Sequence, residues 1–84
     1  SMGKFIIRYK REGCIGAGVC VAIKPQIWYL NPDDLMADLI GGAKKGDVFE
    51  LEVDELDEYL LESARGCPAN VITIFEKETG KQIT

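Results

Sequence analysis

The sequence predicts a small α+β fold in which two helices pack on an antiparallel sheet. Several short segments alternate apolar and polar residues, the two-residue period of a half-buried strand. One longer segment, residues 54–67, spaces its apolar residues at helical intervals instead. Along the chain these segments give a strand, a loop with a short helix, further strands, a long helix and a last strand.

The first quarter of the chain predicts a strand, a loop and a short helix. Residues 4–10 alternate in polarity and predict the first strand. Residues 13–18 are rich in glycine and predict an irregular loop. Residues 19–24 form an apolar run that fits one or two helical turns, and Pro25 predicts that this helix ends near Ile23.

The middle of the chain predicts strands separated by turns. Residues 27–30 predict a strand, and the Asn-Pro-Asp-Asp sequence of residues 31–34 predicts the turn that closes it. Residues 35–40 and 48–53 flank a glycine-rich segment, so the simplest interpretation is strand, turn, strand. We expect Phe49, Leu51 and Val53 to share one face of the second arm, and Lys44 and Lys45 to lie at a solvated loop tip.

The long helix is predicted to open at Asp54, which can cap it, with Asp57 three residues later in a first turn rich in acids. Gly66 and Pro68 predict where it stops. Its apolar face is predicted to carry Leu56, Leu60, Ser63, Ala64 and Cys67.

Residues 71–75 are β-branched and predict the last strand. The polar tail from Glu78 is expected to fray. A chain of 84 residues is too short for two cores, so we expect residues 1–84 to form a single domain.

Composition excludes several classes of function. The chain has no histidine, which excludes Ser-His-Asp and Cys-His catalysis and histidine-ligated zinc as ordinarily built. Its net charge of −4 argues against nucleic acid as a partner. Neither a membrane-spanning apolar run nor a signal-peptide core is present, so we expect no membrane insertion and a cytoplasmic location.

Three cysteines stand close to breaks in the predicted regular structure. Cys14 lies in the glycine-rich loop, Cys20 follows after five residues, and Cys67 directly precedes Pro68. An odd number argues against a disulfide scaffold, and cysteines in a reducing cytosol are core residues, catalytic groups or metal ligands. Ligand cysteines occur where the backbone can curl around a group, so this placement favours a cofactor.

The bacterial ferredoxin run is C-x2-C-x2-C-x3-C-P, whose thiolates hold an iron–sulfur cluster. On this chain Cys14 and Cys20 occupy the first and third positions, Ala17 the second, and Lys24 the fourth, followed by Pro25. The remote Cys-Pro pair of the family is matched at residues 67–68, and residues 69–74 are similar to the segment that follows it. The chain therefore resembles a single-cluster bacterial or archaeal-type ferredoxin over nearly its whole length.

The resemblance implies a small ferredoxin-like fold in which Cys14, Cys20 and Cys67 are the metal ligands. Ala17 has no donor atom, so this three-cysteine variant suits a [3Fe-4S] cluster, which lacks one corner iron. The alternative is a [4Fe-4S] cluster with water, hydroxide or an external thiol at the Ala17 corner. Lys24 cannot support a second cluster, nor can Lys24 and Tyr59 form the extra disulfide of some single-cluster members.

Backbone N–H groups of the cysteine loop can donate to the cluster sulfurs, and Gly16 and Gly18 permit the close approach that this requires. An apolar sheath of Ile15, Val19, Ile23, Ile27 and Val71 would limit access of water. The expected cofactor-binding residues are Ile15, Gly16, Ala17, Gly18, Val19 and Pro68. For Trp28, core packing is preferred over a role in electron tunnelling.

The function implied by the resemblance is one-electron transfer between redox enzymes, with no catalysis by the chain itself. Partners would be a reductase, another oxidoreductase or a haem monooxygenase that docks transiently. An acidic surface could steer a basic partner, although an ordinary solvated face is the alternative. Its residues are Asp47, Glu50, Glu52, Asp54, Glu55, Asp57, Glu58 and Glu62.

Three other functions stay open at this point. A cluster-based sensor could use an open iron site, but the sequence shows no DNA-binding element. A structural zinc module could use the three cysteines and one acid, although zinc prefers closely spaced cysteine pairs. A cluster-free ferredoxin-like binding domain would leave the placement of the cysteines unexplained.

Overall fold

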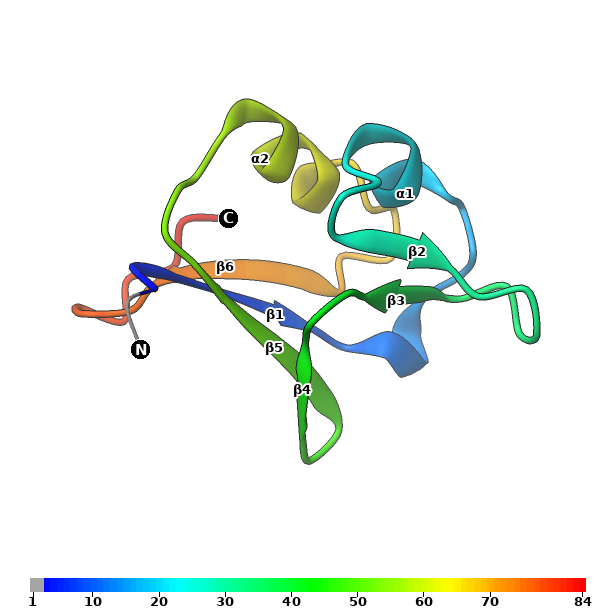
Figure 1. Ribbon diagram of the computed structural model, residues 1–84, viewed down its shortest axis with the longest axis horizontal. Coiled ribbons are helices and arrows are strands. Elements are labelled where there is room, and N and C mark those ends of the chain that lie inside the picture. Colours follow the sequence, from blue (N-terminus) through cyan, green and yellow to red (C-terminus); the bar gives the residue numbers. More distant parts are fainter. Residues whose placement is uncertain (1–2) are drawn as a thin grey trace.

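Two helices lie over one face of a four-stranded antiparallel sheet in the computed structural model, which describes residues 3–84 (Figure 1). The α+β class is confirmed. The strand order in this sheet is β4-β5-β1-β6, and β2 and β3 form a second, two-stranded sheet. The strands are β1 (Phe5–Tyr9), β2 (Trp28–Leu30), β3 (Ala37–Leu39), β4 (Ala43–Lys45), β5 (Val48–Val53) and β6 (Ile72–Glu76). The helices are a 3-10 turn, η1 (Arg11–Gly13), and two α-helices, α1 (Val19–Ile23) and α2 (Glu58–Arg65).

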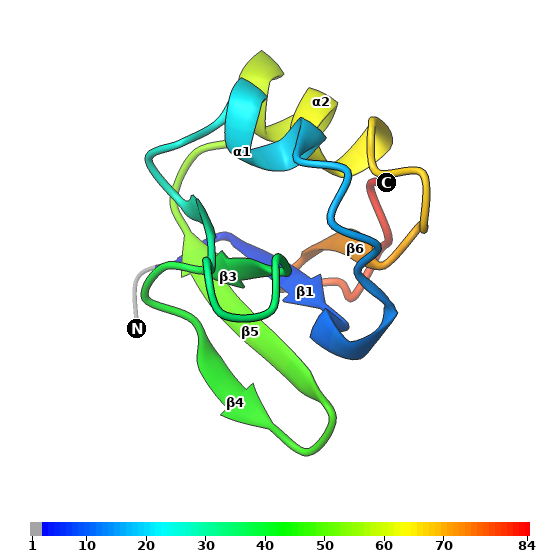
Figure 2. The same ribbon diagram turned by 90° about the vertical axis from the view of Figure 1, so that its right-hand side faces the viewer.

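Strand β1 is at the centre of the sheet, where the alternation in its sequence buries one side. Ile7 lies opposite Leu51 of β5 and Ile74 of β6, and both Ile7 and Ile74 are fully buried. The helices α1 and α2 lie side by side above this apolar face (Figure 2). The alternation of Phe49, Leu51 and Val53 is confirmed, because all three pack against the core.

Trp28 links the small sheet to the helices. Its ring packs edge-on against Tyr9, with centroids 5.0 Å apart, and its indole N–H donates to Ser63 Oγ at 3.2 Å. Ser63 in turn donates to the carbonyl of Leu60 at 2.7 Å. Trp28 is buried, in agreement with the packing role preferred from the sequence.

Helix α2 begins later than the sequence predicts. Asp57, and not Asp54, is its N-cap, because the Asp57 side chain accepts the N–H of Leu60 at 2.7 Å. Leu56 therefore packs against the core from the connection that precedes the helix. The predicted end is confirmed at Gly66, and Leu60, Ser63 and Ala64 form the buried face.

The predicted hairpin between residues 35–40 and 48–53 is wrong in its pairing. Residues of β3 pair with β2, with Trp28 opposite Leu39, whereas β5 pairs with the short strand β4. The turn between β4 and β5 contains Gly46 at a positive φ of 67°, which glycine adopts without strain. Lys44 and Lys45 are exposed as expected, but they belong to strand β4 and not to a loop.

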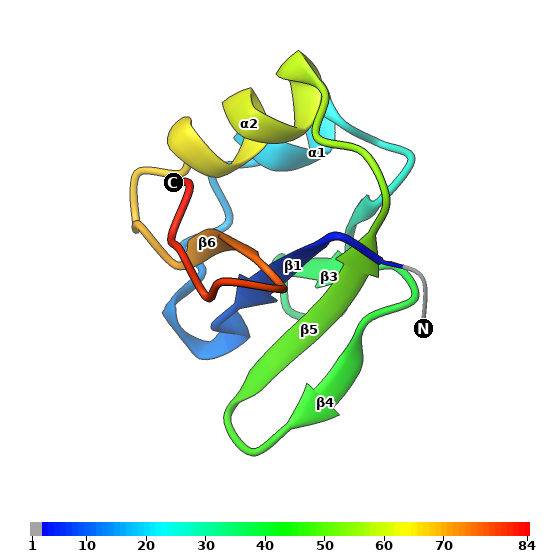
Figure 3. The ribbon, with the colours of Figure 1, turned by 90° about the vertical axis from the view of Figure 1, so that its left-hand side faces the viewer.

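The C-terminal tail is also better ordered than expected. It runs beside β6 (Figure 3). The N–H of Ile83 donates to the carbonyl of Ile74 at 2.7 Å, Gln82 bridges to Phe75, and Ile83 packs against the core. The expectation that the tail frays is wrong, because Ile83, an apolar residue in a polar segment, anchors the tail to the core. Within residues 3–84, no helix combines the length and apolar character needed to cross a membrane.

Candidate metal centre

The three cysteines come from three different segments, and all three lie in or against the hydrophobic core. Cys14 follows η1, Cys20 is the second residue of α1, and Cys67 comes just after α2. Cys20 is buried, and Cys14 and Cys67, both half-buried, pack in the cluster to which it belongs. All three thiols are free. All three cysteines that sequence spacing singled out thus lie in or against the hydrophobic core.

The cysteine loop depends on two glycines at positive φ. Gly16 has a φ of 71° and Gly18 a φ of 76°, so the unusual dihedral angles predicted for this loop are confirmed. A Cβ on Gly16 would lie only 2.6 Å from the carbonyl oxygen of Leu35, so the loop packs closely against the segment before β3. Gly18 is the N-cap of α1 and turns the chain so that Cys20 enters the core.

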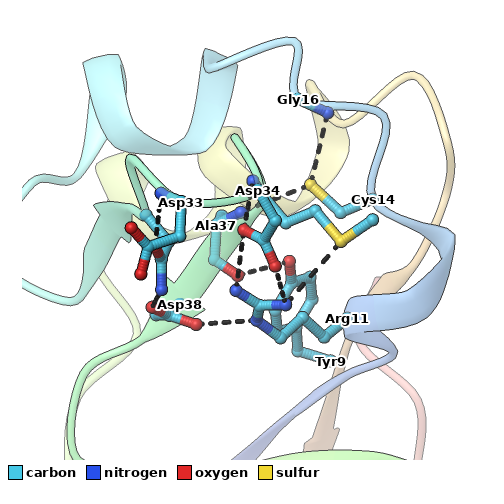
Figure 4. Close-up of polar contacts among 10 residues, drawn as sticks. Tyr9, Arg11, Cys14, Gly16, Asp33, Asp34, Ala37 and Asp38 are labelled. Atoms are coloured by element: carbon cyan, nitrogen blue, oxygen red, sulfur yellow. Dashed lines mark hydrogen bonds and ion pairs between the residues drawn. The ribbon is translucent and has the colours of Figure 1, made fainter.

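The sulfur of Cys14 accepts hydrogen bonds from the backbone (Figure 4). The N–H of Gly16 lies 3.4 Å and the N–H of Ala37 3.5 Å from Cys14 Sγ. Burial acts to raise the pKa of the Cys14 thiol. The Ala37 amide, the Tyr9 hydroxyl, the Gly16 amide and the Arg11 charge outweigh burial, and the pKa falls below its ordinary value. This sulfur is in an environment that stabilises negative charge.

Cys20 differs because burial dominates its environment. Burial raises the pKa of the Cys20 thiol to about 11, and the charges of Cys14 and Cys67 add to the shift. Negative charge on Cys14 and Cys67 therefore disfavours the Cys20 thiolate. A metal at this place would offset the repulsion, since thiolates bind metal ions in the deprotonated form.

Cys67 is positioned by the turn that leads from α2 to β6. The N–H of Asn70 donates to the carbonyl of Cys67 at 3.1 Å, and Asn70 has a positive φ of 56°. Asparagine tolerates this conformation better than most residues. Pro68, in the same turn, is exposed, so the sequence around Cys67 returns the chain to the sheet while the thiol stays on the inner side.

The remaining predicted site residues differ in their burial. Ile15 is 68 % exposed, so its side chain does not contribute to the expected apolar sheath. Ala17 is exposed as well, whereas Val19 is half-buried and faces Gly66. Ile27 and Val71 pack against the core. Ile23 is half-buried.

Three residues near Cys14 could not be singled out from the sequence: Tyr9, Arg11 and Ala37. Tyr9 is buried, and its hydroxyl donates to the carbonyl of Ala37 at 2.7 Å. Burial is the main reason that the pKa of Tyr9 is raised, and the neighbouring Cys14 adds to it. Arg11 bonds to Asp34 and Asp38 in the same region. These contacts span 23 to 28 positions, so no local pattern reveals them.

The donor set that the fold offers consists of three cysteine thiols. Within the described residues 3–84, no three or more His, Cys, Asp or Glu side chains are placed to hold one metal ion. In an iron–sulfur cluster the thiolates bind different irons, so their sulfurs need not converge on one point. Three thiols and inward N–H donors fit that requirement.

The expected acidic surface is partly neutralised by ion pairs. Glu50 lies 2.7 Å from Arg8 and 3.3 Å from Lys45. Glu52 lies 2.8 Å from Lys77, and Asp57 lies 2.6 Å from Lys24. These three acids therefore contribute less to a steering field than their number suggests. The other acids of the predicted surface are Asp47, Asp54, Glu55, Glu58 and Glu62, all exposed.

Comparison with known protein families agrees with this arrangement of cysteines. The model of one family, described as a 4Fe-4S single cluster domain, matches residues 7–74. The matched segment runs from β1 to β6 and contains Cys14, Cys20 and Cys67. No curated protein and no solved structure gave a significant match. Because the match spans most of the 84 residues, the chain belongs to the 4Fe-4S single cluster domain family.

Proposed function

We propose that this protein is an electron carrier, and not an enzyme, that passes one electron between redox enzymes through a single iron–sulfur cluster. Cys14, Cys20 and Cys67 would be its ligands. The observation that supports the proposal is that three free thiols from three segments lie in or against the core, two of them flanking a loop with two left-handed glycines. Membership of the 4Fe-4S single cluster domain family supports it.

The proposed cluster is of the [3Fe-4S] type. Ala17, at the second position of the cysteine run, has no atom that can bind iron. A three-iron cluster lacks the corner that such a residue would hold. A [4Fe-4S] cluster with a non-protein ligand at that corner is the alternative, and membership of a 4Fe-4S single cluster domain family favours it.

The chain's own residues have three tasks in this function. When bound, the cluster would supply a one-electron couple. The N–H groups of Gly16 and Ala37 stabilise negative charge at Cys14 Sγ, and burial of Cys20 limits access of water. The exposed segment with Ile15 and Ala17 leaves little protein between the site and a docked redox enzyme.

Anaerobic purification followed by analysis of iron and acid-labile sulfide tests the proposal. We expect a brown protein containing both elements, and loss of both in Cys20→Ser. Ala22→Ser, an exposed change in the same helix, is the matched control and should keep its iron. A colourless wild-type protein that contains stoichiometric zinc would refute the proposal. Electron paramagnetic resonance then identifies the cluster, since oxidised [3Fe-4S] is paramagnetic and oxidised [4Fe-4S] is silent.

A further inference from the structure

Arg11 ties both ends of residues 34–38 to the part of the chain that precedes Cys14 (Figure 4). Its Nη1 and Nη2 atoms lie 2.7 and 3.1 Å from the two carboxylate oxygens of Asp34. Its Nε atom lies 2.7 Å from Asp38 Oδ1. The planar guanidinium fixes the direction of these bonds as well as their length. The segment is therefore clamped at both ends by one side chain.

Ala37 lies between the two clamped acids and is the residue that reaches the site. Its N–H donates to Cys14 Sγ at 3.5 Å, and its carbonyl accepts the hydroxyl of Tyr9 at 2.7 Å. The side chain of Arg11 is largely buried in this network, with 21 % of it exposed. The position of an N–H donor at the Cys14 sulfur therefore depends on the clamp.

The clamped segment has a conformation that its sequence does not favour. Leu35 has a positive φ of 59°, which costs a residue with a bulky side chain about 1–3 kcal/mol. Such a conformation persists only where surrounding contacts impose it. The Arg11–Asp34 pair is adjacent to Leu35, and the Leu35 carbonyl lies against Gly16. Loosening the clamp would let the segment relax away from the cysteine loop.

We propose that Arg11 is a positioning residue that raises the reduction potential of the cluster by holding the Ala37 N–H against Cys14 Sγ. The inference rests on the proposed function, because it requires Cys14 to be a cluster ligand. Hydrogen bonds to cluster sulfurs favour the reduced state, which carries more negative charge. The positive charge of Arg11 acts in the same direction but is offset by the paired carboxylates of Asp34 and Asp38, so the test has to separate charge from position.

Two substitutions separate the effect of position from the effect of charge. Arg11→Lys keeps the positive charge but loses the planar guanidinium that bonds Asp34 and Asp38. Asp34→Asn removes a negative charge and also weakens the contact between residues 11 and 34. If the position of the Ala37 N–H sets the potential, both substitutions lower the equilibrium constant for one-electron reduction about tenfold, which corresponds to about 59 mV. If charge alone matters, Arg11→Lys changes nothing and Asp34→Asn raises the potential.

The potentials are measured by spectroelectrochemical titration of the cluster-loaded proteins. Hydrogen–deuterium exchange with mass spectrometry gives a second measurement that is independent of the potential. We expect faster exchange over residues 34–38 in both variants. Arg8→Lys is the matched control, because Arg8 makes a similar 2.7 Å contact with Glu50 on an exposed part of β1. It should change neither the potential nor the exchange of this segment.

The two proposals fail in different ways. A wild-type protein without iron and sulfide would overturn the proposed function and this inference with it. A cluster-loaded wild type, together with a potential in Asp34→Asn that is unchanged or raised, would overturn the inference alone. If Arg11→Lys does not assemble a cluster, Asp34→Asn still distinguishes the two explanations. The substitution is nearly isosteric, and the position explanation and the charge explanation predict shifts of its reduction potential in opposite directions.

Discussion

Lys24 Nζ lies 2.6 Å from Asp57 Oδ2 and so joins the end of α1 to the start of α2. The other oxygen of Asp57 accepts the N–H of Leu60 at 2.7 Å, so a single carboxylate caps one helix and pairs with the other. In the ferredoxin pattern Lys24 occupies the position from which some relatives form a disulfide to the second helix. Tyr59, the position that the resemblance implies for the other end of that disulfide, is 63 % exposed, and Lys24 pairs with Asp57.

The dual role of Asp57 makes it the most sensitive acid near α2. Asp57→Ala removes the cap and the ion pair, and we expect it to lower the free energy of unfolding by about 1–2 kcal/mol. Lys24→Met removes only the ion pair, which is partly exposed, and should cost about 0.5 kcal/mol. Urea denaturation of both single variants and the double variant gives the coupling between them.

Asp54→Ala is the control for this series, because Asp54 is the acid that the sequence predicts as the cap. Since the Asp57 side chain and not that of Asp54 accepts the Leu60 N–H, we expect Asp54→Ala to change stability by only a few tenths of a kcal/mol. Equal losses in Asp54→Ala and Asp57→Ala would contradict the observed start of α2.

The lowered pKa values of three carboxylates determine how we expect the stability of the fold to depend on pH. Hydrogen bonds from Arg11, Arg8 and Lys24 hold the pKa values of Asp34, Glu50 and Asp57, respectively, below their ordinary range. A folded pKa below the unfolded value gives stability that is present above the unfolded pKa. That stability is lost as pH falls through the folded pKa.

We therefore expect the unfolding midpoint in urea to stay level from about pH 7 to 5 and to fall below about pH 4. Wild type and Asp57→Asn are measured side by side, so that any contribution of the cluster is common to both. The variant should be less stable near neutral pH and should lose less stability on acidification. Parallel curves for the two proteins would show that Asp57 does not contribute to this dependence.

Sequence patterns predicted the elements that depend on neighbouring residues. The alternation of β1, the end of α1 before Pro25 and the buried face of α2 all follow from local spacing. The pairing of strands does not follow from local spacing. The alternation in residues 37–39 is compatible with pairing to β2 or to β5, and in the structure Leu39 lies opposite Trp28 of β2. The sequence does not distinguish the start of α2, because both Asp54 and Asp57 can cap a helix.

The site shows the same division between local and distant contacts. Cys14, Cys20 and Cys67 could be singled out because their spacing and their positions beside glycine and proline are visible in the sequence. Arg11 could not, because its role depends on Asp34 and Asp38, which only the folded chain brings to it. Residues that touch the ligands through a distant loop leave no pattern in one sequence.

Gly16 and Gly18 allow backbone strain to be separated from close packing. Their φ values are 71° and 76°, so alanine at either position costs about 1 kcal/mol for the left-handed conformation. A Cβ on Gly16 would also lie 2.6 Å from the Leu35 carbonyl oxygen, whereas one on Gly18 has no neighbour within 4 Å. Gly16→Ala should therefore be the more destabilising variant and should bind less iron.

Iron per chain after anaerobic reconstitution and the unfolding free energy are the two measurements for this pair. Because Gly18→Ala shares the φ strain but not the collision, it is the matched control. Equal effects of the two substitutions would mean that the contact between the cysteine loop and Leu35 is unimportant for assembly.

Ala17→Cys tests whether the second position of the cysteine run faces the missing corner of the cluster. Ala17 is exposed in the loop between Cys14 and Cys20, so a new thiol can be accommodated there without displacing core residues. We expect iron to rise from about three to about four per chain, because a fourth thiolate can hold the corner iron. The paramagnetic signal of the oxidised protein should disappear at the same time.

Ala17→Ser controls for the added side chain, since a hydroxyl is a much poorer ligand for iron than a thiolate. It should keep the iron content and the signal of the wild type. Unchanged iron in Ala17→Cys, starting from a three-iron wild type, would contradict the assignment of Ala17 to the second position. A wild type that already holds four irons and is silent when oxidised would instead indicate a non-protein ligand at this corner. Ala17→Cys would then displace that ligand, altering the spectrum without changing the iron content.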